Sequence, residues 1–305
     1  MKNILDNIKL VVLDTDIWTG RRSLSETDLK MSAGKELPPA SLATLGSKLV
    51  MDPEVLAVFQ NLKKAAVRVL LRVGTRFLGA YAIPVTKIDQ VMEEVNAIEK
   101  EFNIKKQAFM DSYQASLDSW VAANPGWEII IKNAAVASTD AAAKLKFATQ
   151  VIEINPVAGQ EQGLEKEVNS LAGQLRQEIE VMAQMTWKQS FQGKSEVTQK
   201  ALRPLKAMVE KIEGLTFLER SLDDLVQGLR DSLTGLPSKG VIKGRHLAAA
   251  CGILSVLGNI PEAAEAMEIG ETTEDSEETI DSAIVTPAVM QSAQPSQTIL
   301  PTEWF

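Results

Sequence analysis

The clearest hydrophobic pattern lies between residues 52 and 74. Asp52 followed by Pro53 is a typical helix start, and Gly74 is a typical helix end. Between them, apolar residues recur at steps of three and four, which places them on one face of a helix: Val55, Phe59, Leu62, Ala66, Val69 and Val73. The pattern predicts an amphipathic helix whose apolar face packs against another element.

Two longer segments carry the same kind of stripe. The first runs from Thr86 and Asp89, a capping-box-like start, to Asn124, and its stripe is Val91, Val95, Ile98, Phe102, Phe109, Tyr113, Leu117 and Trp120. The second runs from about Glu161 to Gln192, and its stripe is Leu164, Val168, Leu171, Leu175, Ile179, Met182 and Met185 or Thr186. Because the first helix would be roughly 55 Å long, we predict that the two form a long antiparallel coiled-coil hairpin. The same seams could instead close between two chains, as a homo-oligomer.

Three short apolar runs predict strands, at residues 8–18, 76–84 and 147–154, and we expect them to form a minor β-sheet. A further short strand is predicted at 48–51, and further helices at 127–135, 140–145, 195–212, 217–233 and 245–257. The predicted fold is therefore mainly α, with a long helical hairpin and a small sheet. We divide it into an N-terminal α+β part (1–84), a helical hairpin and bundle (85–258) and an acidic tail (259–305).

Charge separates the end of the chain from the rest. From Asn259 to Phe305 there are ten acidic residues and no lysine or arginine, although the net charge of the whole chain is −8. Low hydrophobicity with one sign of charge predicts a disordered segment. The preceding residues together carry +2, and this near-neutral balance argues against a strongly basic nucleic-acid-binding protein.

The composition excludes several kinds of site. One histidine, His246, and one cysteine, Cys251, rule out structural zinc sites, iron–sulfur clusters and a disulfide framework, and we expect no cofactor. Cys251 stands in an apolar run and is expected in the core. Residues 1–10 lack an apolar run of signal-peptide length. The longest uncharged apolar stretch, from His246 to Pro261, is too short to cross a bilayer. We therefore expect a cytoplasmic protein without membrane contact.

Asp14 and Asp16 are the candidates for catalysis. They end an apolar strand in an Asp-x-Asp pattern, which resembles the first motif of haloacid-dehalogenase-type phosphatases, where one carboxylate attacks phosphorus and the other acts as acid or base beside Mg²⁺. The long helical segments do not fit the alternating strands and helices of such enzymes. A magnesium-dependent phosphatase or nuclease is thus an alternative function, and a strand end whose carboxylates cap a turn is the structural interpretation.

A basic stripe follows the apolar stripe of the first helix on the opposite face. Its members are Lys63, Lys64, Arg68, Arg72 and Arg76, and no acidic residue interrupts them. A solvated helix face is the ordinary interpretation of such a stripe. The functional interpretation is a patch for an acidic protein surface, for a weak contact with a nucleic-acid backbone, or for the chain's own acidic tail.

The last residues form a second interaction candidate. Trp304 and Phe305 end the sequence behind an acidic run, and the tail from Asn259 to Glu303 has no other aromatic side chain. The layout resembles the acidic tails of single-stranded-DNA-binding proteins, whose terminal aromatic ring docks on partner proteins. The tail is therefore either a disordered solubilising segment or a short recognition peptide, and the second interpretation would suit an accessory factor of DNA processing.

Several segments between residues 13 and 154 together resemble an uncharacterised bacterial family, a domain of unknown function found in phages, conjugative plasmids and integrative elements. The segments are DTDIWTGRR (14–22), LPPASLATLGSK (37–48), Asp52-Pro53, GTRFLGAYAIP (74–84) and SWVAANPGW (119–127). The resemblance implies a gene neighbourhood with MoxR-type AAA+ ATPases. Together with long amphipathic helices and no catalytic constellation, it predicts a non-enzymatic accessory or scaffold protein that binds an AAA+ ATPase.

Overall fold

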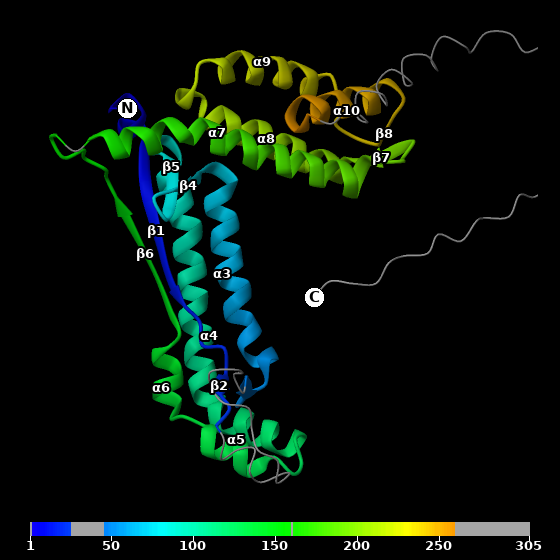
Figure 1. The fold of residues 1–305 in the computed structure, drawn as a ribbon. Helices are drawn as coiled ribbons and strands as arrows, with labels where there is room; N and C mark the ends of the chain where they lie inside the picture. The colour runs from blue at the N-terminus through cyan, green and yellow to red at the C-terminus, as the bar shows by residue number, and fades with distance from the viewer. Residues whose placement is uncertain (1, 26–45, 160, 260–305) are drawn as a thin grey trace, which may run out of the picture.

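The computed structural model describes residues 2–25, 46–159 and 161–259 of the 305-residue chain. It is mainly helical with small β-sheets, which confirms the predicted fold class at that level. Figure 1 shows two lobes that meet at a corner. The long lobe contains α3 (Pro53–Val73) and α4 (Ile88–Ala123), and the helical lobe contains α7 (Glu161–Thr186) and α8 (Leu202–Gly214).

Helix α3 forms as its sequence predicts. Asp52 Oδ1 accepts a hydrogen bond from the backbone N–H of Glu54 at 2.9 Å, and Pro53 takes the first helical position, where no N–H donor is needed. The buried residues of α3 are Leu56, Phe59, Leu62, Ala66 and Leu70. Because Val55, Val69 and Val73 of the predicted stripe are only partly buried, the buried face is rotated slightly from that stripe.

Helix α4 lies along α3. It begins after a single 3-10 turn, η1 (Val85–Lys87), and no side-chain hydrogen bond caps it, so the predicted capping box does not form. The ring of Phe59 in α3 meets the rings of Phe102 and Phe109 in α4 edge to face, with centroid distances of 5.0 and 6.0 Å. These edge-to-face contacts join the two helices in a common core.

The three predicted strand regions build one antiparallel sheet. Its order is β4-β5-β1-β6, and its strands are β1 (Ile8–Asp16), β4 (Thr75–Phe77), β5 (Ala80–Pro84) and β6 (Lys146–Ile152). The minor sheet is thus confirmed, although residues 76–84 form a hairpin and not a single strand. The chain reverses at Leu78 and Gly79, which both have positive φ (49° and 76°), as in a type I′ turn.

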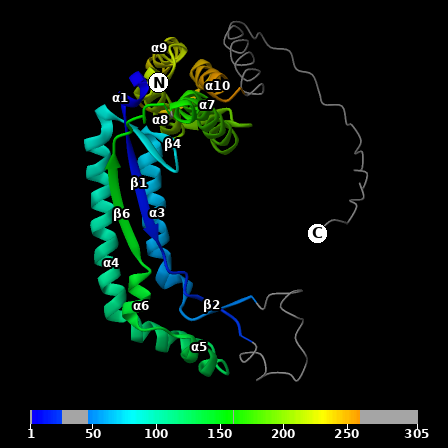
Figure 2. The same cartoon turned by 60° about the vertical axis from the view of Figure 1, so that its left-hand side comes forward.

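Strand β1 is buried on both faces over its first half. Val11 points into the core of α3 and α4, whereas Leu10 packs with Val168 and Leu171 of α7. Successive side chains of a strand point to opposite faces, so one strand serves both cores. Figure 2 shows β1 and β6 continuing as a ribbon alongside α3 and α4, away from α7.

Shorter elements connect these parts. In the long lobe they are α1 (Lys2–Asp6), β2 (Arg21–Ser23), β3 (Ser47–Leu49), α5 (Glu128–Ala134) and α6 (Ser138–Ala143). In the helical lobe they are the π-helical turn η2 (Trp187–Phe191), β7 (Glu196–Thr198), η3 (Gln199–Ala201), η4 (Thr216–Leu218), α9 (Ser221–Thr234), β8 (Val241–Lys243) and α10 (Arg245–Gly258).

The predicted helix at 195–212 was wrong over its first third. Residues Glu196–Thr198 form β7, which pairs with β8, and α8 begins only at Leu202. Pro204 therefore lies in the first turn of α8 and not in the interior of a helix. In the first turn, backbone N–H groups have no helical acceptor, so the missing N–H of proline costs no hydrogen bond.

The structure does not confirm the coiled-coil hairpin. Helix α4 packs on α3, α5 and α6, whereas α7 packs on α8 and α10 in the other lobe. The buried clusters also group α3 with α4 and place α7, from Leu175 onward, with α8, α9 and α10. The boundary between the α3–α4 core and the core of the helical lobe consequently follows β6.

Candidate functional site

Figure 1 shows that α7 and α8 cross the end of α3 at the inner corner between the lobes. The side chains of these elements leave an open groove there. It has a volume of about 910 Å³ and is lined by residues of α3, α7 and α8, with Arg76 from β4. We call it the inner-corner groove.

A buried lysine lies at the base of the groove. The Nζ of Lys211 in α8 donates hydrogen bonds to the backbone oxygen of Leu71 in α3 at 2.8 Å and to Glu178 Oε2 in α7 at 2.7 Å. The hydroxyl of Thr75 in β4 donates to the other oxygen of Glu178 at 2.9 Å. Lys211 is only 2% exposed, and a buried ammonium group is tolerated only when it is paired in this way.

This network joins four elements across the corner. Lys211 and Glu178 belong to the helical lobe, and Leu71 and Thr75 belong to the long lobe. No buried side-chain nitrogen or oxygen in the described part of the chain lacks a hydrogen-bond partner. The lysine therefore fixes how α8 meets the end of α3, and with it the shape of the groove.

Three residues of the predicted basic stripe line the groove: Arg68, Arg72 and Arg76. Arg72 is paired with Glu94 of α4 at 2.6 Å, and the guanidinium of Arg76 lies 5.8 Å from the ring centre of Tyr81. Arg68 is exposed and has no hydrogen-bond or ion-pair partner within the described ranges. The two lysines of the stripe, Lys63 and Lys64, lie outside the groove lining.

The opposite wall carries exposed apolar side chains. Val181 of α7 is 49% exposed and lines the groove next to the partly buried Met182. Met185, one turn further along α7, is 55% exposed and extends the apolar surface. Apolar side chains opposite guanidinium groups match a ligand that has both carboxylates and apolar groups.

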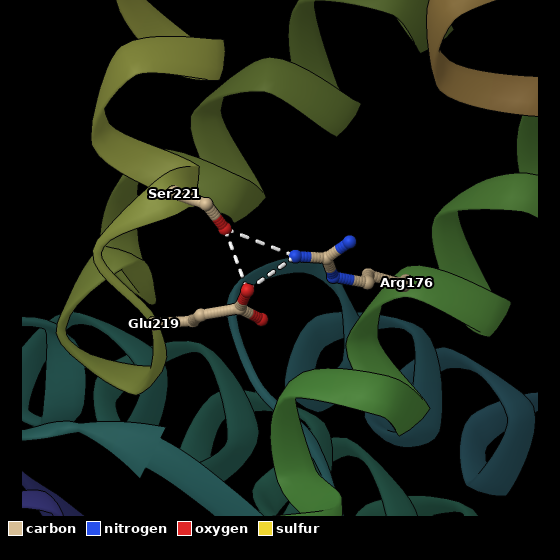
Figure 3. A network of polar contacts seen from close by, with 3 residues as sticks. All are labelled: Arg176, Glu219 and Ser221. Carbon is tan, nitrogen blue, oxygen red and sulfur yellow. Dashed lines mark hydrogen bonds and ion pairs between the residues drawn. The ribbon is translucent and has the colours of Figure 1, made fainter.

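The other flank of α7 is held by a polar network (Figure 3). One guanidinium nitrogen of Arg176 donates to Glu219 Oε1 at 2.6 Å and to Ser221 Oγ at 3.0 Å, and the Ser221 hydroxyl donates to the same carboxylate oxygen at 2.6 Å. The serine hydroxyl, and after it the guanidinium, lower the pKa of Glu219. The network ties the start of α9 to α7, which carries the apolar wall of the groove.

The structure places Asp14 and Asp16 together on one exposed face of β1. They follow Leu10 and Val12 on the same face, but lie beyond the part of the strand that α7 covers. Lys146 of β6 forms an ion pair with Asp14. The hydrogen bond to Asp14 and the negative charge of Asp14 are the main causes that raise the pKa of Lys146. The ion pair thus joins β1 to β6 at the surface of the ribbon.

The surroundings of these aspartates differ from the expected enzyme. Strand β1 is antiparallel to both of its neighbours, whereas such phosphatases place their carboxylates at the ends of parallel strands. Within residues 2–25, 46–159 and 161–259, no group of three or more His, Cys, Asp or Glu could hold a metal ion. What the geometry provides is a surface ion pair.

Cys251 is a core residue, as its apolar surroundings predict. It is buried in α10, and burial raises the pKa of its thiol to about 11 from the ordinary 9.0. Reactive cysteines have lowered pKa values. Cys251 therefore packs as a small apolar side chain.

The sequence prediction missed the residues that complete the groove, namely Lys211, Glu178, Val181 and Met182. One signal was present in the sequence. Lys211 lies three residues after Met208 and four before Leu215, both of which are buried, so it interrupts an apolar helix face. A lysine in such a position indicates a buried pair. The other candidates, Trp304 and Phe305, lie outside the described residues.

These features define a two-lobed, mainly helical protein with an open groove between its lobes. The chain matches the family described as "Protein of unknown function (DUF3150)" over residues 5–259, and it belongs to this family. The match confirms the predicted relationship to an uncharacterised family and extends it beyond residues 13–154 to the whole helical lobe. No curated protein and no solved structure matches the chain.

One further observation concerns membranes. Among the described residues, no helix combines the length and the apolar character that crossing a bilayer requires.

Proposed function

We propose that this protein is a non-enzymatic accessory or scaffold protein that binds a protein partner in the inner-corner groove. The observation that carries the proposal is the groove itself, an open hollow of about 910 Å³ with an arginine wall and an apolar wall. Exposed apolar side chains in a hollow, beside arginines, are typical of the anchoring part of a protein interface.

The shape of the groove is set before a partner arrives. Lys211 and Glu178 hold its base, and the Arg176 network holds the helix that forms its apolar wall. A preorganised site loses less conformational entropy on binding, so more of the contact energy appears as affinity.

We propose an AAA+ ATPase of the MoxR type as the partner, and a phage, plasmid or integrative element as the setting. Support for this choice comes from the resemblance of residues 13–154 to a family with such neighbours. The open groove and the two-lobed form fit a subunit that is held by a larger machine, and the surface of the long lobe offers a further contact area.

The test is a binding measurement between the purified full chain and the AAA+ protein encoded beside its gene. Arg68→Glu and Val181→Asp each change one exposed residue of the groove, and we expect each to weaken binding at least about tenfold. Lys64→Glu is the matched control, because it makes the same charge change one turn away on α3, outside the groove.

Two results would overturn the proposal. One is an ATPase that neither binds the chain nor changes its turnover when the chain is added. The other is equal weakening by the groove variants and by Lys64→Glu. Binding of duplex or single-stranded DNA, with affinity that falls steeply as salt rises, would favour instead the accessory factor of DNA processing.

A further inference from the structure

We propose that the inner-corner groove is the docking site of the chain's own acidic C-terminal segment, residues 260–305. This inference concerns the chain by itself and needs no ATPase. It rests on the proposed function only for its consequence, which is that the segment competes with the partner for one groove.

Charge complementarity is the first argument. Residues 260–305 contain ten carboxylates and no basic side chain. The carboxylate of Glu178, which lines the groove, is already paired with Lys211, and that of Glu94 in α4 is paired with Arg72. Arg68 and Arg76 are exposed there without a carboxylate partner among the described residues. The groove is therefore a cationic site, and carboxylates are the groups that guanidinium ions bind best.

The point where the described chain ends is the second argument. Gln184 of α7 donates a hydrogen bond to the backbone oxygen of Gly258 at 3.4 Å, so the end of α10 lies against α7. Val181, in the apolar wall, is on the same helix one turn earlier. The segment 260–305 therefore starts near Gln184, only about one helical turn along α7 from the groove residue Val181.

The length of the segment is the third argument. Forty-six residues follow Asn259, and at roughly 3.3 Å per extended residue only a few of them are needed to reach the groove. A tether of this kind gives an effective concentration on the order of millimolar. Weak contacts are therefore sufficient for docking within one chain.

The sequence of the segment fits the two walls. The acidic run Glu271–Asp281 supplies carboxylates for Arg68 and Arg76, and Ile284 and Val285 follow it after two small residues. These two aliphatic side chains match the exposed Val181 and the partly buried Met182. The docked segment covers apolar surface that otherwise faces water.

The experiment follows the mobility of a spin label in the full chain. Because Cys251 is buried and its thiol pKa is about 11, the substitution Ser282→Cys provides the reactive thiol for a nitroxide. We expect slow label motion in the otherwise unchanged chain. Raising salt from about 0.1 M to about 1 M shortens the Debye length from about 10 Å to about 3 Å, and should free the label.

Variants connect this motion to the groove. Arg68→Glu with Arg76→Glu should lower the docking equilibrium at least about tenfold, whereas Lys64→Glu should leave the motion unchanged. Replacing Glu274 and Asp275 by lysine in the double-glutamate variant should restore slow motion, because the charges are then exchanged. Circular dichroism and melting temperature verify that each variant is folded.

Several outcomes would overturn the inference. A label that moves freely in the unchanged chain, or one whose motion does not respond to Arg68→Glu with Arg76→Glu, excludes docking in the groove. Slow motion that disappears on dilution shows that a second copy supplies the segment. If the label moves freely in the chain without groove substitutions and the ATPase still binds that chain, this inference is rejected and the proposed function remains intact.

Discussion

Lys211 shows how one residue determines the corner of this molecule. Its ammonium group contacts α3 and α7 while its own helix packs in the core of the helical lobe. A buried charge is costly to leave unpaired, so the residues around it are constrained to remain in place. The geometry of the groove therefore depends on a residue that is almost inaccessible to solvent.

The first prediction concerns the loss of this lysine. Lys211→Met keeps the length and apolar stem of the side chain but removes both hydrogen bonds, so Glu178 loses its partner. We expect the free energy of unfolding to fall by about 2–3 kcal/mol, measured by urea denaturation. The value lies below the usual range for buried pairs because Glu178 keeps the bond to Thr75 and is partly exposed.

A double substitution tests whether Lys211 and Glu178 stabilise the fold through their interaction with each other. Adding Glu178→Gln to Lys211→Met removes the uncompensated charge, and we expect it to recover part of the loss. If the two single substitutions instead add up fully in the double variant, the lysine and the glutamate do not interact and the network is not the cause of the stability.

The second prediction concerns Cys251. Because burial raises its thiol pKa to about 11, the fraction of thiolate at pH 8 is about 0.1%, against about 10% for a thiol of pKa 9. We expect a thiol reagent such as dithionitrobenzoate to react at least about 100-fold more slowly with the native chain than with the unfolded chain. Equal rates would contradict the buried position.

The same pKa shift has a defined effect on stability. The folded state keeps its proton at a pH where the unfolded state has lost it, so the contribution of Cys251 is fully present below pH 9 and is lost as the pH rises toward about 11.

The candidate site could be predicted in part at this scale. The basic stripe was visible because its members are spaced by a helical period along one segment, and three of them do line the groove. The opposite wall was not visible, because Val181 and Met182 reach the groove only through the folding of segments about one hundred residues apart. Which distant segments lie next to each other is set by the tertiary fold and not by a local pattern.

At the scale of elements, the passage from α3 into the sheet depends on one glycine. A Cβ at Gly74 would overlap the carbonyl oxygen of Ala82 and the side chain of Ile83 in β5. Gly74 therefore allows the end of α3 to lie directly against the sheet, close to the base of the groove. By contrast, a Cβ at Gly173 in α7 would have no atom within 4 Å.

The third prediction compares these two glycines. Gly74→Ala should destabilise the chain by about 1–3 kcal/mol, because the helix end or the strand must shift. Gly173→Ala should stabilise it by about 0.5–1 kcal/mol, since alanine restricts the unfolded chain and favours the helix. Thermal unfolding of both variants against the unchanged chain is the measurement. A neutral Gly74→Ala would contradict the close approach of α3 and β5.

Elements with strong local signals could be predicted from the sequence. Helix α3 has a cap, a first-turn proline and a terminal glycine, and its predicted bounds agree with the structure. The β4–β5 hairpin was missed because its turn is Leu78-Gly79, which lacks the Asn-Gly or Asp-Gly pattern of such turns. Strand β7 was missed because it is only three residues long and precedes a helix.

At the scale of the molecule, an apolar stripe shows that a helix face is buried but not what buries it. Both long helices have the predicted seams, yet α4 uses its seam for α3. Helix α7 uses its seam for β1 at Val168 and Leu171, and for α8 and α10 from Leu175 onward. The predicted hairpin assumed that helices with similar seams pair with each other. The sheet keeps the two seams apart, because α3 and α4 pack on the Val11 face of β1 and the first half of α7 packs on its Leu10 face.

The last prediction is that the two lobes unfold as one unit. Helix α7 contributes Val168 and Leu171 to the cluster around β1, and Leu175 and Ile179 to the core of the helical lobe. The destabilising effect of a cavity in the helical lobe should therefore extend to the sheet.

Leu202→Ala, at a fully buried site in α8, should lower the free energy of unfolding by about 2–5 kcal/mol. It should also raise the rate of hydrogen exchange at the β1 amides at least about 30-fold, because about 1.4 kcal/mol corresponds to a factor of ten. Val256→Ala, on an exposed site of α10, is the matched control and should leave β1 unchanged. Faster exchange confined to α8, α9 and α10 in Leu202→Ala would show instead that the lobes are independent, and that the corner between them is not a fixed part of the fold.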